Sequence, residues 1–296
     1  MTTPPLLTVY DASTHEYLRH RWLNCLSYLE VDSESKIAHK WFNAIINRYD
    51  HHDRLFHDTV RLYDQLMDLS IITDCEKVTK LMAASLSFAM FFQFYEYTPG
   101  HAPQVSTCNS EIAGMACYQL GVGIGSTAFI QSCLLGSWDH EVTSYNTALF
   151  HDAELSLLGE APPKYMQYTN DLFLECCDWD DTKWYTARQK WLSRMLTLAA
   201  EGRLYYTDTC RRSLETTAIS NMRKEFSVNQ RRLNTLAAYD DVFEDHPNPE
   251  LTNPYYEHDY TTGMKLGEHI TINGQLHVWD GVELVLKENE FEETPF

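Results

Sequence analysis

The segment from Leu81 to Phe94 would be apolar on nearly every face if it were helical. Ser85 and Ser87 interrupt the apolar run, which is well short of the roughly 20 residues that a membrane span requires. A helix that is apolar all round must be covered by other elements on all sides. The segment therefore predicts a central, fully buried helix in a multi-helix fold, and it argues against an integral membrane protein.

Helical spacing of apolar residues continues over most of the chain, from about residue 11 to residue 232. The glycines Gly121, Gly123 and Gly125 predict a break between two helices, and Ser126 is a candidate cap for the second. They do not form a dinucleotide-binding loop, because their spacing differs from GxGxxG and no strand precedes them. Further helices are expected to start at Pro162 and at Asp180. The predicted fold class is mainly α.

The composition changes after residue 239. Residues 240–259 contain seven acidic side chains, three prolines and no Lys or Arg, which predicts an extended linker. Residues 270–278 then alternate around Asn273-Gly274, a strong signal for a β-hairpin, and residues 282–286 could add a third strand. We therefore expect a helical extension at 1–40, a helical domain at 41–239, and an acidic linker with a β-hairpin at 240–296.

The net charge restricts the kinds of partner that the protein can bind, and the cysteine content indicates its cellular compartment. The chain has 23 Lys and Arg against 42 Asp and Glu, a formal charge of −19. Such a surface repels nucleic acids and anionic membranes unless a local basic patch exists, and it favours protein partners, for example a basic protein. Eight cysteines without a CxxC pair indicate reduced thiols in an intracellular protein. No secretory signal or Arg-rich presequence is evident, so a cytoplasmic location is the default and an organellar one stays open.

Two motifs carry a family resemblance. Residues 49–62 contain Tyr49, Arg54 and His57, and residues 150–159 read Phe-His-Asp-Ala-Glu-Leu-Ser-Leu-Leu-Gly. In this order they resemble the HD superfamily of predicted metal-dependent phosphohydrolases, over roughly residues 41–225. Other positions that match in the same order are Tyr165, Tyr168, Glu175, Arg188, Tyr205, Tyr206, Glu215, Ala218 and Asn221. The resemblance implies an HD-domain-like helical bundle around a central pocket, and a site built from His57, a His-Asp doublet, His140 and Asp152.

The departures from the family pattern concern the metal ligands. The doublet is replaced by Phe92 and Gln93, and Arg61 stands where a second histidine is expected. Phenylalanine cannot bind a metal, and glutamine is a poor substitute for a bridging carboxylate. The resemblance thus implies a vestigial pocket without catalytic or metal-binding residues, formed by Arg54, His57, Phe92, Gln93, His140 and Asp152. On this interpretation the protein is a catalytically inactive HD-fold subunit, structural or interaction-mediating, of a larger assembly, and it needs no cofactor.

An alternative is a shifted metal site. Glu96 follows Phe92 by four residues and would share its face if the helix continued past Gln93. With His57, His140 and Asp152 it could then hold Mn, Fe, Zn or Mg, in a divergent phosphohydrolase of a nucleotide or small phosphate ester. A third interpretation is a small-ligand sensor in which Arg54 contacts an anion.

Each of these residues also has a purely structural interpretation. His57 could bond Asp53 one turn earlier, Arg54 could pair with Asp50 or Asp58, and Asp152 could cap a helix over residues 153–158. His140 could close the C-terminus of its helix. The tryptophans Trp179, Trp184 and Trp191 are interpreted as packing anchors.

Overall fold

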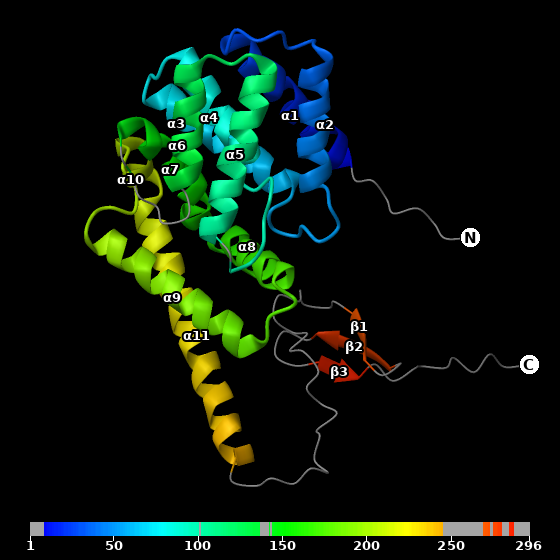
Figure 1. Ribbon diagram of the computed structural model, residues 1–296. Helices are drawn as coiled ribbons and strands as arrows, with labels where there is room; N and C mark the ends of the chain where they lie inside the picture. Colours follow the sequence, from blue (N-terminus) through cyan, green and yellow to red (C-terminus); the bar gives the residue numbers. More distant parts are fainter. Residues whose placement is uncertain are drawn as a thin grey trace, which may run out of the picture. The chain divides into compact units, whose positions relative to one another are not determined.

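The prediction of a mainly helical protein is confirmed. A computed structural model describes residues 9–100, 102–136, 142, 144–244, 269–272, 275–279 and 284–286. These residues form eleven α-helices and one 3₁₀ helix (Figure 1). The α-helices are α1 (Val9–Tyr28), α2 (Lys36–Tyr49), α3 (Thr59–Cys75), α4 (Lys80–Phe92), α5 (Ala102–Leu120), α6 (Ile124–Gly136), α7 (Tyr145–Leu155), α8 (Pro162–Glu175), α9 (Asp181–Ala200), α10 (Asp208–Ser213) and α11 (Glu215–Glu244). The 3₁₀ helix η1 (Ser156–Gly159) directly follows α7.

The chain divides into two compact units, Met1–Leu236 and Ala237–Phe296. Helix α1 packs against α3 and α4, so the region expected as an N-terminal extension shares the core of the first unit. Helix α11 runs to Glu244, past the expected start of the linker at residue 240, because no proline or glycine interrupts the chain between Glu215 and Pro247. The rest of the expected linker, residues 245–259, lies outside the described residues.

Three short strands are described in the second unit. They are β1 (His269–Ile272), β2 (Gln275–Trp279) and β3 (Leu284–Leu286), in the order β1-β2-β3. Both pairings are antiparallel, with Ile272 opposite Gln275 and Trp279 opposite Leu284.

Helix α4 is the centre of the first unit (Figure 1). It packs against α1, α3, α5, α6 and α7, and every residue from Ala84 to Phe92 is buried. The hydroxyls of Ser85 and Ser87 donate to the carbonyls of Leu81 and Ala83, which satisfies these buried polar groups within the helix. The expected central buried helix is thus present. Within the described residues, no helix combines the length and the apolar character needed to cross a membrane.

The predicted glycine break separates α5 from α6. Gly121 has a φ of +82°, and the N–H of Val122 donates to the carbonyl of Cys117 at 2.9 Å, a hydrogen bond that closes the C-terminus of α5. The expectation that Ser126 caps the next helix is wrong, since α6 already begins at Ile124. The carbonyl of Gly123 accepts the first helical bond from Thr127, so Gly123 occupies the N-cap position, where glycine is tolerated.

Aromatic packing around α4 leads to a first prediction. The ring of Phe88 stacks on Trp22 at 5.3 Å and on Phe92 at 5.1 Å, and it is fully buried. Phe88→Ala should lower the free energy of unfolding by about 3–5 kcal/mol, because it leaves a cavity in the core. Urea denaturation followed by circular dichroism measures this. Tyr118→Ala, at a position that is 86% exposed on α5, is the control and should change stability by less than about 0.5 kcal/mol. Equal losses in both variants would contradict this view of the core.

Candidate functional site

The first unit contains a cavity of about 330 Å³. Its aromatic lining consists of Phe56, Phe94, Tyr97, Tyr168, Trp179, Trp184 and Trp191. Its polar and charged lining consists of His57, Arg61, Gln65, Gln93, Thr98, Ser106, Glu154, Thr169 and Arg188. The three tryptophans were expected to be packing anchors only, and they also form the cavity wall. An apolar cavity with a small set of converging polar groups is the usual form of a small-molecule site.

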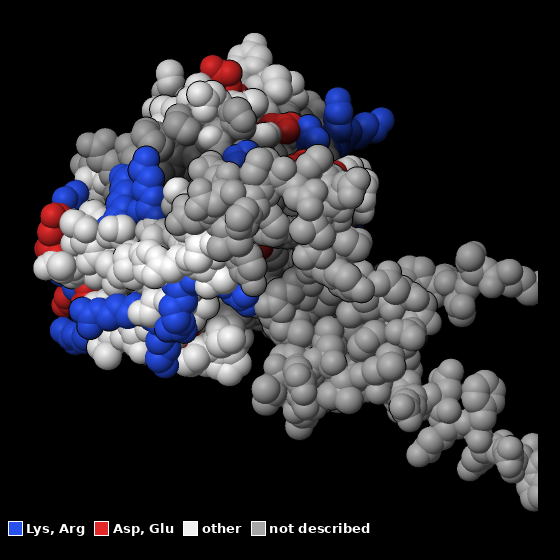
Figure 2. Space-filling view, turned by 90° about the horizontal axis from the view of Figure 1, so that it is seen from below, with Lys and Arg blue, Asp and Glu red and all other residues white. Residues whose placement is uncertain are grey.

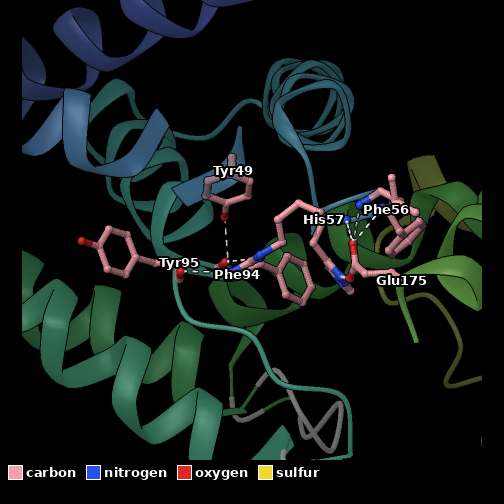
Figure 3. Close-up of polar contacts among 8 residues, drawn as sticks. Tyr49, Phe56, His57, Phe94, Tyr95 and Glu175 are labelled. Atoms are coloured by element: carbon pink, nitrogen blue, oxygen red, sulfur yellow. Dashed lines mark hydrogen bonds and ion pairs between the residues drawn. The ribbon is translucent and has the colours of Figure 1, made fainter. Parts of the chain in front are cut away.

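Glu175, the last residue of α8, bonds to the segment that precedes α3 (Figure 3). Its Oε2 accepts the backbone N–H groups of Leu55, Phe56 and His57 at 3.0, 2.8 and 2.9 Å. Its Oε1 lies 2.5 Å from Nδ1 of His57. The partner of His57 is therefore 118 residues away in the sequence, and it is not Asp53. Asp53 instead lies beside His51 and His52 at the surface.

The charge states within this pair follow from its surroundings. Burial lowers the pKa of His57, and the bond to Glu175 opposes this shift only in part. Burial would raise the pKa of Glu175, but the hydrogen bonds and charge of His57 and the backbone N–H groups outweigh it and lower the pKa to about 2. At neutral pH the carboxylate of Glu175 is therefore ionised, and Nδ1 of His57 donates its proton to it.

Phe92 and Gln93, which the resemblance places at the position of the doublet, lie in different surroundings. Phe92 is fully buried among aromatic rings, including Trp41 at 5.7 Å and Phe88, and it does not line the cavity. Gln93 does line the cavity, and its Oε1 accepts a hydrogen bond from Nε2 of Gln65 at 3.1 Å. Gln93 is thus hydrogen-bonded to Gln65, and Phe92 is packed against aromatic rings.

The continuation of the central helix past Gln93, which a shifted metal site requires, is not observed. Helix α4 ends at Phe92, and Asn109 of α5 holds the following turn. The Asn109 amide donates to the carbonyls of Gln93 and Glu96 at 2.8 and 2.9 Å, and its Oδ1 accepts the N–H of Glu96 at 2.8 Å. Glu96 consequently pairs with Arg48. The expectation that Glu96 shares the helix face of Phe92 is wrong for this reason.

Asp152 lies inside α7 and is fully buried. Its carboxylate accepts the backbone N–H groups of Tyr206 and Thr207 at 2.9 and 2.7 Å and the Thr207 hydroxyl at 2.6 Å. Burial raises the pKa of Asp152, and these hydrogen bonds oppose the shift. The carboxylate thus holds the turn before α10. The alternative role as a cap on residues 153–158 is wrong, because Asp152 lies inside α7. Asp152 is not among the residues that line the cavity.

The predicted ligand residues do not converge in the described part of the chain. Only His51, His52 and Asp53 bring three possible ligand atoms within 4.8 Å of one another there, and all three residues are exposed. His57, Glu96 and Asp152 form no such group, and His140 lies outside the described residues.

Arg54, the expected anion contact, is bonded elsewhere. Its guanidinium donates to the carbonyls of Phe94 and Tyr95 at 2.8 and 3.3 Å, and it does not line the cavity. The Tyr49 hydroxyl accepts the N–H of Phe94 at 3.1 Å, so two residues of the first motif hold the turn after α4 (Figure 3).

Arg61 is the buried cation of the site, and its position was not foreseen. It is 3% exposed, its Nη2 donates to the carbonyl of Glu154 at 2.8 Å, and its guanidinium lies over the rings of Phe56 and Tyr168. Arg61 thus forms part of the cavity wall.

Comparison with protein-family models, with curated proteins and with solved structures gave no match for this chain. The interpretation of the site therefore depends on its own geometry.

The bonds of Glu175 lead to a second prediction. Because its pKa is about 2 in the folded protein against 4.5 ordinarily, the charged carboxylate stabilises the fold above pH 4.5. Glu175→Gln should lower the free energy of unfolding at neutral pH by about 3 kcal/mol. The difference from the wild type should shrink as the pH falls from 4.5 toward 2, where the native carboxylate also takes up a proton.

Urea denaturation of both proteins at a series of pH values measures this difference. Glu201→Gln is the control, since Glu201 forms an exposed pair with Arg203 and should contribute little at any pH. A difference that stays constant through the acidic range would contradict the proposed ionisation of Glu175.

Proposed function

We propose that this protein is a catalytically inactive, HD-domain-like helical protein that works by binding, as an interaction subunit of a larger assembly. This proposal is supported by the contacts of the side chains at the vestigial ligand positions, which are bonded to or packed against other residues of the protein. His57 is bonded to Glu175, Phe92 is packed in the aromatic core, Gln93 is bonded to Gln65, and Asp152 is bonded to Thr207.

The chemistry of a metal-dependent phosphohydrolase requires a bound ion that activates water. Phe92 offers no donor atom, and both oxygens of Asp152 already accept hydrogen bonds from the turn before α10. Asp152 also does not line the cavity that His57 lines. The geometry therefore favours binding over hydrolysis.

This proposal predicts the metal content of the purified protein. After equilibration with Mn²⁺, Fe²⁺, Zn²⁺ or Mg²⁺ and gel filtration, we expect far less than one ion per chain by mass spectrometry. Asp152→Ala and His57→Gln should leave that content unchanged, and the wild type should release no phosphate from nucleotides or simple phosphate esters. One ion per chain that is lost in either variant, together with hydrolysis, would instead support the divergent phosphohydrolase.

The distribution of charge supports an interaction role. The 50 residues from 183 to 232 hold 11 Lys and Arg against 4 Asp and Glu, whereas the rest of the chain holds 12 against 38. This segment is therefore strongly basic within a chain of net charge −19. Much of it belongs to α9 and α11, which lie side by side where Gln189 donates to Gln230 at 3.1 Å.

Several of these cations are free to contact a partner. Lys190 on α9 and Arg223, Lys224 and Arg231 on α11 are exposed, and no described acidic residue forms an ion pair with them. Figure 2 shows basic side chains over the described part of the face seen from below, with few acidic ones among them. We call Lys190, Arg223, Lys224 and Arg231 the cationic face. A positively charged surface fits an acidic protein partner.

Charge reversal on this face tests the partner. Lys224→Glu/Arg231→Glu should weaken binding of poly-L-glutamate, measured by fluorescence anisotropy at low salt, by roughly tenfold, because it replaces two cations by two anions. Lys36→Glu/Lys40→Glu on α2 is the matched control and should bind like the wild type. Equal binding by both double variants, or tighter binding of duplex DNA than of poly-L-glutamate, would contradict an acidic protein partner at this face.

A further inference from the structure

The cavity wall contains a pair of glutamines whose hydrogen bonding is incomplete. Gln65 on α3 and Gln93 at the end of α4 are 1% and 4% exposed, and both line the cavity. Nε2 of Gln65 donates to Oε1 of Gln93 at 3.1 Å. Oε1 of Gln65 and Nε2 of Gln93 are buried and have no hydrogen-bond partner in the described structure. The pair thus presents one free acceptor and one free donor.

This result does not depend on how the amide oxygen and nitrogen atoms are assigned. If both side chains are turned over, Gln93 donates to Gln65, and the atoms left over are again one donor and one acceptor. Buried polar groups in native proteins are nearly always satisfied, and those that are not call for an explanation. A ligand in the cavity that offers both a donor and an acceptor would satisfy both.

The remaining cavity wall indicates the rest of the ligand. Its aromatic side chains include Trp179, Trp184 and Trp191, so a flat, apolar ring system can pack among them. The volume of about 330 Å³ lies at the lower end of the range for small-molecule pockets, roughly 300–1,000 Å³.

Nearby acidic groups offset the charges of the two arginines in the wall, although Nε of Arg61 is buried without a hydrogen-bond partner in the described structure. Arg188 forms two hydrogen bonds with Glu225, at 2.6 and 3.0 Å. Arg61 donates to the carbonyl of Glu154 and lies near the carboxylates of Asp64 and Asp68. Glu175, which holds His57, is bonded outside the lining. An uncharged ligand therefore fits the cavity better than an anion.

We propose that this cavity binds a flat, uncharged aromatic molecule with an amide or lactam edge, which the free acceptor and the free donor of the Gln65–Gln93 pair recognise. The proposal rests on the proposed function, in that the cavity binds and does not hydrolyse. It adds the chemical class of the ligand, which is neither a metal ion nor a phosphate ester.

Simple probes test this recognition on the full-length protein. Benzamide offers a donor and an acceptor, acetophenone has a similar shape but offers only the acceptor, and benzoate is an anion of similar shape. Quenching of tryptophan fluorescence reports binding, because three tryptophans line the cavity, and protein-detected NMR titration gives an independent measure. EDTA is present throughout, so the result does not depend on whether the protein binds metal.

Two double variants separate recognition from a general effect on folding. Gln65→Leu/Gln93→Leu removes both partners of the buried bond together, which is tolerated better than the loss of one partner. Gln189→Leu/Gln230→Leu is the matched control, because these two glutamines form a similar bond outside the cavity.

We expect the wild type and the control variant to bind benzamide about tenfold more tightly than acetophenone, and benzoate more weakly than benzamide. In Gln65→Leu/Gln93→Leu the preference for benzamide should disappear while acetophenone still binds. Equal binding of benzamide and acetophenone by the wild type, no binding of either, or tighter binding of benzoate would overturn the proposal, even if the Leu variant did not fold. A preference for benzamide that survives in that variant would overturn it as well.

Discussion

The carboxylate of Glu175 joins two segments that lie far apart in the sequence. It is the last residue of α8, and it accepts three consecutive backbone N–H groups from Leu55 to His57 as well as the His57 ring. Those N–H groups belong to a segment without helical structure before α3, where they have no helical partners. This interaction holds Phe56 and His57, which line the cavity together with Trp184 and Trp191 of α9. The Phe56 ring adds a second contact to α8, edge-on to Tyr168 at 6.0 Å between ring centroids.

The end of α4 separates the cavity from the core. Phe92 is the last residue of the helix and packs into the aromatic cluster, whereas Gln93, the next residue, lines the cavity and bonds to Gln65. Asn109 determines this end, because its amide satisfies polar groups of the turn that a longer helix would have satisfied internally. The same turn directs Glu96 toward Arg48 at the surface. A single side chain from α5 thus holds the turn that carries both Gln93 at the cavity and Glu96 beside Arg48.

The cavity and the cationic face are formed by different side chains of the first unit. In the cavity lining Arg188 is paired with Glu225, while the cationic face on α9 and α11 consists of exposed side chains without described acidic partners. Helix α9 contributes to both, since Arg188 and Trp191 line the cavity and Lys190 is exposed. Binding at the cavity and at the cationic face would therefore involve the same helix.

The sequence by itself determined the helical character of the chain, the buried central helix and the break at Gly121. These features follow from side-chain chemistry and from spacing within a few turns, where periodicity and caps act locally. The tertiary structure alone decided that His57 bonds Glu175, that Asp152 holds the turn before α10, that α4 ends at Phe92, and that three tryptophans line a cavity. Each of these depends on the contact of groups that are far apart in the chain, such as the 118 residues between His57 and Glu175. Local spacing contains no information about such contacts, because the packing of whole helices brings the groups together.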